Sequence, residues 1–557
     1  MTDITEKFKK YKIKPVKETI EDFCNPGKFK LQPQQQFIAD YFSSKEAPPG
    51  MLVYHQIGAG KTCAAISVAE KMKKKYNIMV VLPASLIGNF MDELRSQCPG
   101  EDEYLSKADR NKLSELKPDD KEYQKIMEKS EDKINKYYTI YSYHKFVELT
   151  QRNKIKLKNT LLIIDEVQNM VSLTGTFYKT LKTSIDKSDN TLKILILTAT
   201  PMFDKPNEIG LTLNLLKPKI EFPIGIDFNQ TFLTKKGSGY QTKNLKKFNE
   251  LSHHLISYFR GAPPFTYPEQ LFKVVKCQMS DFQYKSYLTA LSTEGDYVKG
   301  SFRNVDILNL PVNFFLGPRM VSNIAFPNKS IGELGFSSLT EETLQLQNVD
   351  KFSIKFKKIF QKIKKSEGPV FVYSNFKELG GIKSFIKFIE YHGYKNYKVY
   401  GEGPLRYALW TGDEKHQMKE EIKCIFNRKE NDDGSKIKIM LGSPSVREGV
   451  SFKRVRQVHI LEPYWNMSRI LQIIGRAIRF CSHKDLPKKD RNVEVYLYLA
   501  TRKEDTTIDQ YIWSLAKQKS KLIGAFETAL KEVAVDCQLF YHRNVYPIDE
   551  YKLECKN

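Results

Sequence analysis

The sequence has no long apolar run and few cysteines. No stretch of about 18 apolar residues occurs, which excludes a membrane span, and the start at Met1–Lys7 lacks the apolar core of a secretory signal. The eight cysteines are scattered, and none stands in a CxxC pair. This spacing argues against a zinc site or a disulfide scaffold and fits a reducing compartment. We therefore expect a cytosolic protein.

Long Gly, Ser or Pro tracts are also missing, and negative charge is in deficit. The chain has 65 Asp and Glu against 89 Lys and Arg, which gives a formal net charge of +24. Such an excess of positive charge either keeps a protein soluble or allows it to bind a partner with many phosphates. We favour nucleic acid because a nucleotide motif, described below, accompanies the charge. The 557 residues predict about two to four globular domains.

Apolar runs of strand length alternate with helical patterns in residues 31–218 and again in residues 352–502. This rhythm predicts two α/β domains, each a parallel sheet with crossover helices. The expected strands are 51–54, 78–82, 138–140, 161–164 and 194–197 in the first, and 370–373, 398–400, 437–441, 457–461 and 493–498 in the second.

The remaining segments lack that rhythm. Residues 1–30 are expected to be an N-terminal arm, and the charged insertion at 100–136 to form surface helices. Aromatic residues, Pro and Asn rise in residues 219–351, which predicts an inserted bridging region. Residues 503–557 are expected to be a C-terminal helical extension, with a helix from 507 to about 535.

A glycine-rich string after the first expected strand has the pattern of a phosphate-binding loop. Gly58-Ala59-Gly60-Lys61-Thr62 precedes an amphipathic helical pattern. In that context, backbone N–H groups and the helix N-terminus would bind phosphate oxygens. Lys61 would reach the β- and γ-phosphates, and the Thr62 hydroxyl would hold Mg²⁺. The full phosphate-binding pattern has glycine where this chain has His55. A core without that glycine is common in helicase-type motors, so the departure points to that family and does not exclude a nucleotide site.

Two carboxylates follow another apolar run directly. Asp165 and Glu166 come after 161–164, and an acidic pair at the end of a buried strand is costly unless it holds something positive. Asp165 is suited to ligate Mg²⁺, and Glu166 to orient or deprotonate a water. Thr198 and Thr200 end the next run, where they are suited to relay between hydrolysis and substrate.

Paired arginines stand near the other end of the chain. Arg476 and Arg479 are three residues apart in a helical window, which predicts that both lie on one face. Such a pair can stabilise charge on a γ-phosphate. Gln472, one turn earlier, could hydrogen-bond phosphate or water. The alternative is a solvated basic face.

In order and spacing, these strings resemble the motifs of superfamily 2 helicases. Further segments fit the set: Leu31–Gln35 resembles the glutamine motif, Leu82–Ser85 motif Ia, Tyr141–Tyr143 the next strand-contact segment, Val370–Asn375 motif IV, Ser443–Phe452 motif V and Gln472–Arg479 motif VI. Finer features, among them Asp-Glu-Val-Gln and Pro463-Tyr-Trp-Asn466, resemble the helicase-like NTPases of large cytoplasmic DNA viruses and of cytoplasmic linear plasmids. Poxvirus nucleoside triphosphatase I and the early transcription factor ATPase subunit belong to this group.

The resemblance implies an α/β fold of two RecA-like lobes with ATP between them. The implied catalytic residues are Lys61, Asp165, Glu166, Gln472, Arg476 and Arg479, and the implied ATP-binding residues are Gln35, Gly58, Ala59, Gly60, Lys61 and Thr62. Thr62 and Asp165 would hold Mg²⁺. The implied contacts to the nucleic-acid backbone are Pro83, Ser85, Ser142, Thr198, Thr200, Ser374, Asn375 and Ser451.

The resemblance also implies a function. The protein would be a nucleic-acid-dependent ATPase that translocates on or unwinds DNA or RNA in viral transcription. It would be located in the cytoplasmic viral factory or packaged in the virion. Viral RNA polymerase or a transcription factor subunit would be its protein partner. A rival hypothesis is an initiation or termination factor that binds promoter DNA or polymerase and uses ATP for release without strand separation. A P-loop kinase is a more distant rival, because it would leave motifs V and VI without a purpose.

Overall fold

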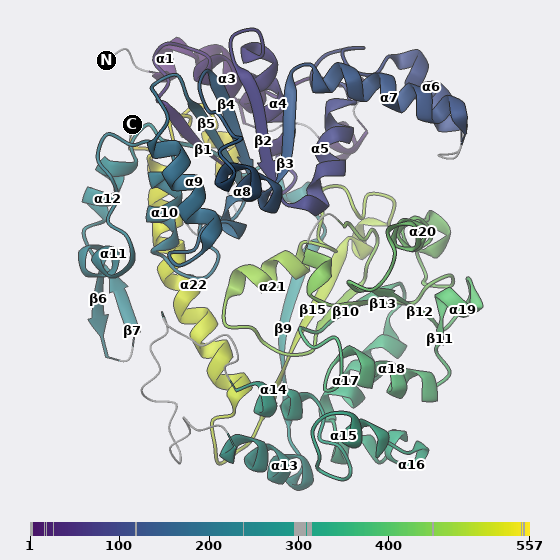
Figure 1. Ribbon diagram of the computed structural model, residues 1–557. Helices are drawn as coiled ribbons and strands as arrows, with labels where there is room; N and C mark the ends of the chain where they lie inside the picture. Colours follow the sequence, from purple (N-terminus) through teal and green to yellow (C-terminus); the bar gives the residue numbers. More distant parts are fainter. Residues whose placement is uncertain are drawn as a thin grey trace. The chain divides into compact units, whose positions relative to one another are not determined.

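The chain forms two compact units, which are described in turn (Figure 1). Unit 1 is Met1–Pro263 with Lys521–Asn557, and unit 2 is Pro264–Ser520. The structure, a computed structural model, describes residues 4–15, 17, 19–25, 27–116, 120–237, 239–293, 308, 315–447, 450–546, 549 and 552–556. Across these described ranges, no helix combines the length and the apolar character that a bilayer crossing requires.

Unit 1 is built on a six-stranded sheet in which every pairing is parallel. Its order is β3 (Tyr138–Ser142), β2 (Asn77–Leu82), β4 (Thr160–Asp165), β5 (Lys193–Thr198), β1 (Gly50–His55) and β8 (Ile256–Phe259). The central strands β1 and β4 are buried at every residue, because both faces of the sheet are covered. The five strands expected from the sequence are confirmed, and β8 is an addition.

Helices α3 (Pro33–Phe42), α4 (Lys61–Met72) and α5 (Ile87–Leu94) share one hydrophobic core with the sheet. The other helices of unit 1 include α8 (Tyr143–Gln151), α9 (Thr176–Asp186), α10 (Glu208–Asn214), α11 (Gly225–Phe232) and α12 (Leu245–Ser252). The charged insertion forms α6 (Lys107–Glu115) and α7 (Lys121–Asn135), which project from the sheet in Figure 1. Both are largely exposed, which confirms the expected surface helices.

Segments from both ends of the chain pack into this core. Phe8, which follows α1 (Ile4–Lys7), and Phe540 each meet the Phe37 ring edge-on, at centroid distances of 5.4 and 5.6 Å. The expected terminal helix is confirmed as α22 (Ile508–Glu532), and the boundary between the units falls inside it. The N-terminal segment and the C-terminal residues 521–557 therefore belong to unit 1, rather than forming an arm and a separate extension.

Unit 1 also contradicts the expectation about cysteine. Cys63 is bonded to Cys98, and Cys537 to Cys555. The partners are 35 and 18 residues apart, so no short spacing in the sequence reveals them. The argument against a disulfide scaffold was wrong because it considered only local cysteine pairs.

Unit 2 contains a seven-stranded parallel sheet. Its order is β11 (Lys395–Asn396), β12 (Arg406–Trp410), β13 (Ile439–Gly442), β10 (Val370–Tyr373), β14 (Gln457–Ile460), β15 (Asn492–Thr501) and β9 (Glu269–Gln278). Alternate side chains point to opposite faces. Val370 and Val372 pack with α17 (Ile354–Lys365) and α18 (Ile382–Tyr391), whereas Phe371 and Tyr373 pack with α20 (His416–Phe426) and α21 (Met467–Ile474).

Two expectations fail in this part of the chain. Residues 398–400 lie in a helical turn, α19 (Tyr397–Tyr400), and β12 is the strand instead. Residues 219–351 are divided between the units, because β8 pairs with β1 and the ten residues of β9 pair with β15. Besides α11 and α12, the region also contains β6 (Leu233–Lys236), β7 (Gly239–Thr242), α13 (Asp281–Ser292), α14 (Leu316–Asn323), α15 (Glu333–Ser337) and α16 (Glu341–Leu344).

Candidate nucleotide and nucleic-acid sites

The glycine-rich loop joins β1 to α4 at the carboxyl end of the first sheet. Gly58 and Gly60 have φ values of 82° and 72°, a left-handed conformation that glycine adopts without strain. Gly60 leads directly into α4, which begins at Lys61. The loop therefore presents its backbone at a helix N-terminus, the arrangement that favours phosphate.

Two glutamines of α3 form hydrogen bonds with the backbone of this loop. The Gln34 side chain donates to the Ala59 carbonyl at 3.3 Å, and that of Gln35 to the Gly60 carbonyl at 3.1 Å. The φ of 72° favours glycine at position 60, and a Cβ atom there would lie 2.4 Å from the Gln35 amide nitrogen, so Gln35 would have to move. Gln35, predicted to bind ATP, is buried and positions the loop in this structure.

Lys61 reaches the two carboxylates that follow β4. Its ammonium lies 2.8 Å from Glu166 Oε1 and 3.7 Å from Asp165 Oδ1. Burial alone would lower the pKa of Lys61, but the Glu166 and Asp165 carboxylates raise it above its ordinary value. Burial raises the pKa of Asp165 to about 6, although Lys61 opposes this shift. Lys61 is therefore the cation that both carboxylates share.

A chain of hydrogen bonds leads from Glu166 to the end of β5. The Gln168 amide donates to the Glu166 carboxylate, and its oxygen accepts a hydrogen bond from the Thr198 hydroxyl at 2.7 Å. The Thr198 hydroxyl in turn accepts from Thr200 N at 2.9 Å. Gln168 thus connects the acidic pair to the Thr198–Thr200 segment, a role that sequence reasoning did not assign to it.

The donor set at this edge suits Mg²⁺. Mg²⁺ prefers oxygen ligands, and Asp165 offers a carboxylate that is largely buried yet lies beside the glycine-rich loop's Lys61. Thr62 adds a half-buried hydroxyl at the first turn of α4. These two residues therefore fit the ion that the sequence assigned to them.

The predicted nucleic-acid contacts of unit 1 also follow the carboxyl ends of strands. Ser85 is exposed after β2, and Ser142 at the end of β3 accepts from Lys145 N as the N-cap of α8. Pro83 is buried, and the Thr200 hydroxyl is buried without a hydrogen-bond partner. Thr198 is fully buried against Gln168, so it positions its neighbours and has no free surface for nucleic acid.

In unit 2, Arg476 and Arg479 converge on one backbone oxygen. Their guanidinium groups donate to the Val450 carbonyl at 3.2 and 3.3 Å, and Arg476 also donates to the Gln472 carbonyl at 3.0 Å. The predicted helical face is wrong in detail, because α21 ends at Ile474 and both arginines lie in the turns that follow. Ser451 is half-buried beside Val450, and Glu448 and Gly449 of motif V lie outside the described residues.

Comparison with known proteins agrees with these motifs. The model of the SNF2-related domain matches residues 34–324, more than half of the chain, and that of the helicase conserved C-terminal domain matches residues 354–481. The chain belongs to the SNF2-related family of superfamily 2 helicases. It is an ATP hydrolase of the helicase type.

Relatives of this SNF2-related protein occur in large DNA viruses. A "Putative ATP-dependent RNA helicase" of Acanthamoeba polyphaga mimivirus is 50% identical over 99% of this chain and 97% of its own length. A second mimivirus protein with the same description is 28% identical over 97% of this chain and 78% of its own. A "Termination factor NPH-I homolog" of African swine fever virus is 28% identical over 88% of this chain and 76% of its own.

In this SNF2-related protein, the buried Glu462 carboxylate accepts hydrogen bonds from two residues of motif IV. The fully buried Ser374 donates its hydroxyl to the Glu462 carboxylate at 2.9 Å, and Asn375 donates its backbone N–H at 2.5 Å and its side-chain amide at 3.1 Å. Burial raises the pKa of Glu462, although Lys355 opposes this shift. Ser374 therefore has no exposed surface for nucleic acid in this structure, whereas Asn375 is only half-buried.

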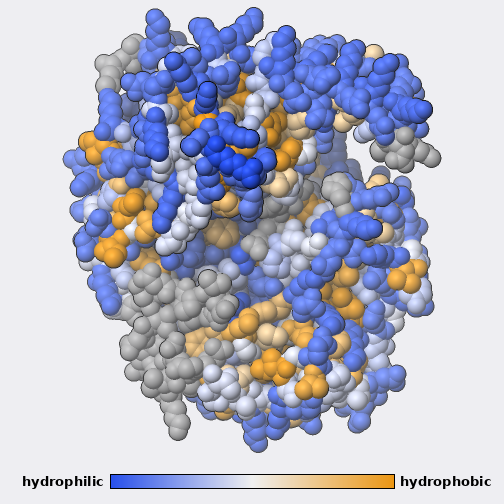
Figure 2. All heavy atoms as spheres, in the orientation of Figure 1, coloured by the Kyte–Doolittle hydropathy of each residue, from blue (hydrophilic) through white to orange (hydrophobic). Residues whose placement is uncertain are grey.

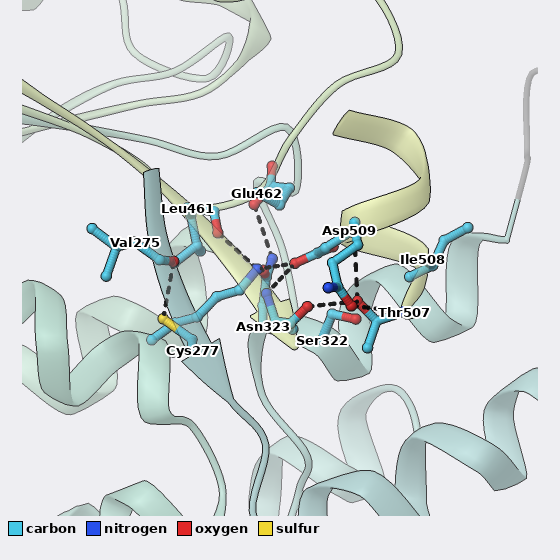
Figure 3. Close-up of polar contacts among 12 residues, drawn as sticks. Val275, Cys277, Ser322, Asn323, Leu461, Glu462, Thr507, Ile508 and Asp509 are labelled. Carbon is cyan, nitrogen blue, oxygen red and sulfur yellow. Dashed lines mark hydrogen bonds and ion pairs between the residues drawn. The ribbon is translucent and has the colours of Figure 1, made fainter. Parts of the chain in front are cut away.

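Figure 3 shows the buried polar cluster that surrounds Glu462. The fully buried Lys355 ammonium lies 2.6 Å from Asp509 and donates at 2.9 Å to both the Asn323 side chain and the Leu461 carbonyl. Asn323 also donates to Glu462 at 2.9 Å. The cluster thus connects motif IV to the start of α22.

His55 belongs to a second buried network, in unit 1. Its Nε2 lies 3.1 Å from the Ser257 hydroxyl, which bonds in turn to Asp536 of the C-terminal segment. Burial lowers the pKa of His55 to about 3, assisted by Lys61, so the ring is neutral. Within the described chain, His55 therefore joins the glycine-rich loop to the C-terminal segment and has no metal-ligand partner set.

The sequence pattern around Glu462 could have identified it as a functional residue, although we did not predict it. Glu462 comes just after the buried strand β14, the same pattern that identified Asp165 and Glu166. Gln168 and Asp536 carried no comparable signal, because Thr198 lies 30 residues from Gln168 and Ser257 lies 279 residues from Asp536.

Proposed function

We propose that this protein is a nucleic-acid-stimulated ATPase that uses Mg²⁺ and ATP to translocate on DNA or RNA during viral transcription, in the viral factory or the virion. The observation that carries the proposal is the bridge from Lys61 to Asp165 and Glu166, extended through Gln168 to Thr198 and Thr200. It joins a nucleotide site to a segment at the end of β5 with a predicted nucleic-acid role. This coupling is what a motor requires and a simple hydrolase does not.

The roles follow from the chemistry of each group. Backbone N–H groups from Gly58 to Thr62 bind phosphate oxygens, and Lys61 exchanges its carboxylate partners for the β- and γ-phosphates. Asp165 and Thr62 hold Mg²⁺, which when bound neutralises phosphate charge. Release from Lys61 frees Glu166 to orient and deprotonate the attacking water.

Motif VI completes the proposed catalytic set. Arg476 and Arg479 stabilise the charge that develops on the γ-phosphate, and Gln472 positions phosphate or water. The support is that both guanidinium groups gather at the Val450 carbonyl, where they stand close enough to act as a pair.

Backbone contacts to nucleic acid are proposed for the residues with accessible groups. They are Ser85, Ser142, Asn375 and Ser451; the Thr200 hydroxyl is buried and is left out of this set. Hydroxyl and amide groups of this kind grip phosphate without reading bases, so binding is expected to be sequence-independent and to weaken with salt.

The test is the ATPase rate with and without nucleic acid. Lys61→Ala should lower kcat to background in both conditions, because it removes the phosphate ligand and leaves two carboxylates without their cation. Lys71→Ala is the matched control, since Lys71 lies on the same helix and is half-exposed. Normal turnover by Lys61→Ala, or a native rate that added DNA and RNA leave unchanged, would refute the proposal.

A second candidate is a termination factor that hydrolyses ATP for release without separating strands. The similarity to the African swine fever virus protein with that description favours it. Single-stranded DNA, duplex DNA and RNA should be compared as ATPase activators beside a strand-displacement assay. Activation without displacement would select this candidate, and displacement would exclude it.

A further inference from the structure

A basic pocket opens on unit 1, away from the motifs described above. Its volume is about 670 Å³, and it is lined by residues of α8, by residues 153–158 and by α9 with the turn that follows. Figure 2 shows the surface over α8 and α9 as strongly hydrophilic. The lining residues include the lysines Lys156, Lys158, Lys179 and Lys187.

The four lysines form two rows. Lys156 and Lys158 are exposed on either side of the buried Leu157, in an extended segment bounded by Asn153 and Asn159. Both asparagines have a positive φ, which turns the chain at each end of the segment. The second row is Lys179–Thr183–Lys187 along α9, because residues four apart share a helix face.

In the described part of the chain, none of these four lysines forms an ion pair with an acidic side chain within 4 Å. Asp186 on α9 is engaged by Lys182 at 2.6 Å instead. Asp189 is the single acidic residue in the lining, and its carboxylate accepts hydrogen bonds from Thr191. Thr183 lies between the two lysines of the α9 row and adds a hydroxyl to the lining. Lys158 acts electrostatically on Asp189, and the four lysines still exceed this one carboxylate in the lining, so the pocket carries a net positive charge.

We propose that this pocket is a second nucleic-acid site, which binds the phosphate backbone of a single strand. Lys179 and Lys187 are about 12 Å apart along the helix axis, or about three nucleotides of helical rise. Of the described lining residues none is aromatic, so bases have no ring on which to stack. The site is expected to bind backbone phosphates with no sequence preference.

The lining argues against a small-molecule ligand. Small-molecule pockets are lined mostly by hydrophobic and aromatic side chains, whereas Ile155 and Leu157 are the aliphatic residues of this lining, whose other side chains are polar or charged. The position of the pocket in unit 1 indicates that it is separate from the proposed nucleic-acid contacts of the helicase motifs. Lys158 and Asp189 precede β4 and β5, at the amino ends of strands whose carboxyl ends bear the motifs. A strand of six residues separates these edges by about 17 Å.

The inference rests on the proposed function in one respect, which is that the bound polymer is nucleic acid. A second site would keep a strand on the protein while the motif contacts release during turnover. It adds affinity without taking part in hydrolysis.

The test compares two quadruple variants. One carries Lys156→Gln, Lys158→Gln, Lys179→Gln and Lys187→Gln. The matched control carries Lys235→Gln, Lys236→Gln, Lys246→Gln and Lys247→Gln, which removes four exposed lysines elsewhere on unit 1. Binding of a fluorescent oligothymidylate is followed by anisotropy at several KCl concentrations without nucleotide, and thermal unfolding confirms that each variant is folded.

Loss of four phosphate contacts should reduce the slope of log K against log salt by about 3, at roughly 0.7 per contact on a single strand. At the lowest salt concentration the pocket variant should bind at least tenfold more weakly than the control. Basal ATPase activity should not change.

Equal slopes in the two variants would overturn the inference, as would polyglutamate that competes as well as unlabelled oligothymidylate. The proposed function fails separately, if nucleic acid does not stimulate the native ATPase while the binding difference persists.

Discussion

The Lys355–Asp509 ion pair offers a quantitative test of how unit 2 is held together. Both side chains are buried, and Lys355 forms the described ion pair with Asp509, on which Arg319 acts from farther away. Lys355→Met leaves that carboxylate buried with the Ala500 N–H as its remaining described donor, at 2.8 Å. Breaking a buried pair from one side costs about 3–5 kcal/mol. The acceptors on Asn323 and Leu461 also lose their donor, which adds to this cost.

Tryptophan fluorescence makes the measurement specific to unit 2. The three tryptophans, Trp410, Trp465 and Trp513, all lie in that unit. Urea unfolding followed at these residues should give a free energy about 4 kcal/mol lower for Lys355→Met than for the native protein. Lys365→Met on the same helix is the control, because Lys365 is exposed; it should change the free energy by less than about 0.5 kcal/mol.

The double variant Lys355→Met/Asp509→Leu separates the pair from its surroundings. With both charges removed, the loss should be smaller than the sum of the single losses by about 2 kcal/mol or more. A loss below about 1 kcal/mol in Lys355→Met would refute the reasoning, because it would mean that the carboxylate finds water or another cation.

Two further predictions concern unit 1. Burial raises the pKa of Asp536 to about 7 from 3.8, so the folded state holds the proton more tightly than the unfolded state. The contribution of Asp536 to stability should therefore be greatest below pH 4 and fall by about 4 kcal/mol as pH rises from 4 to 7. Asp536→Asn should flatten this dependence in urea unfolding, and an unchanged slope would contradict the assignment. Gln168→Ala should lower nucleic-acid stimulation of the ATPase about tenfold or more, because a hydrogen bond to a carboxylate is lost. Its basal rate should stay within about threefold, and equal loss of both rates would show that Gln168 does not act in coupling.

Local patterns in the sequence predicted the parts of the fold that depend on local order. Every expected strand of the first sheet is present, because an apolar run such as 161–164 must be buried on both faces wherever it lies. The acidic pair and the glycine-rich loop were found for the same reason, since each needs only neighbours along the chain and a strand end. Where the pattern was short and mixed, as in residues 398–400, the prediction of a strand failed.

Tertiary structure decided everything that depends on distant partners. It placed β8 and β9 in different sheets, returned the C-terminal segment to unit 1 and buried the Ser374 and Thr198 hydroxyls that the sequence offered to nucleic acid. The sequence by itself determined the family, the ATPase motifs and the parallel sheets. It did not determine which polar groups face inward, because burial depends on segments that approach from elsewhere in the chain.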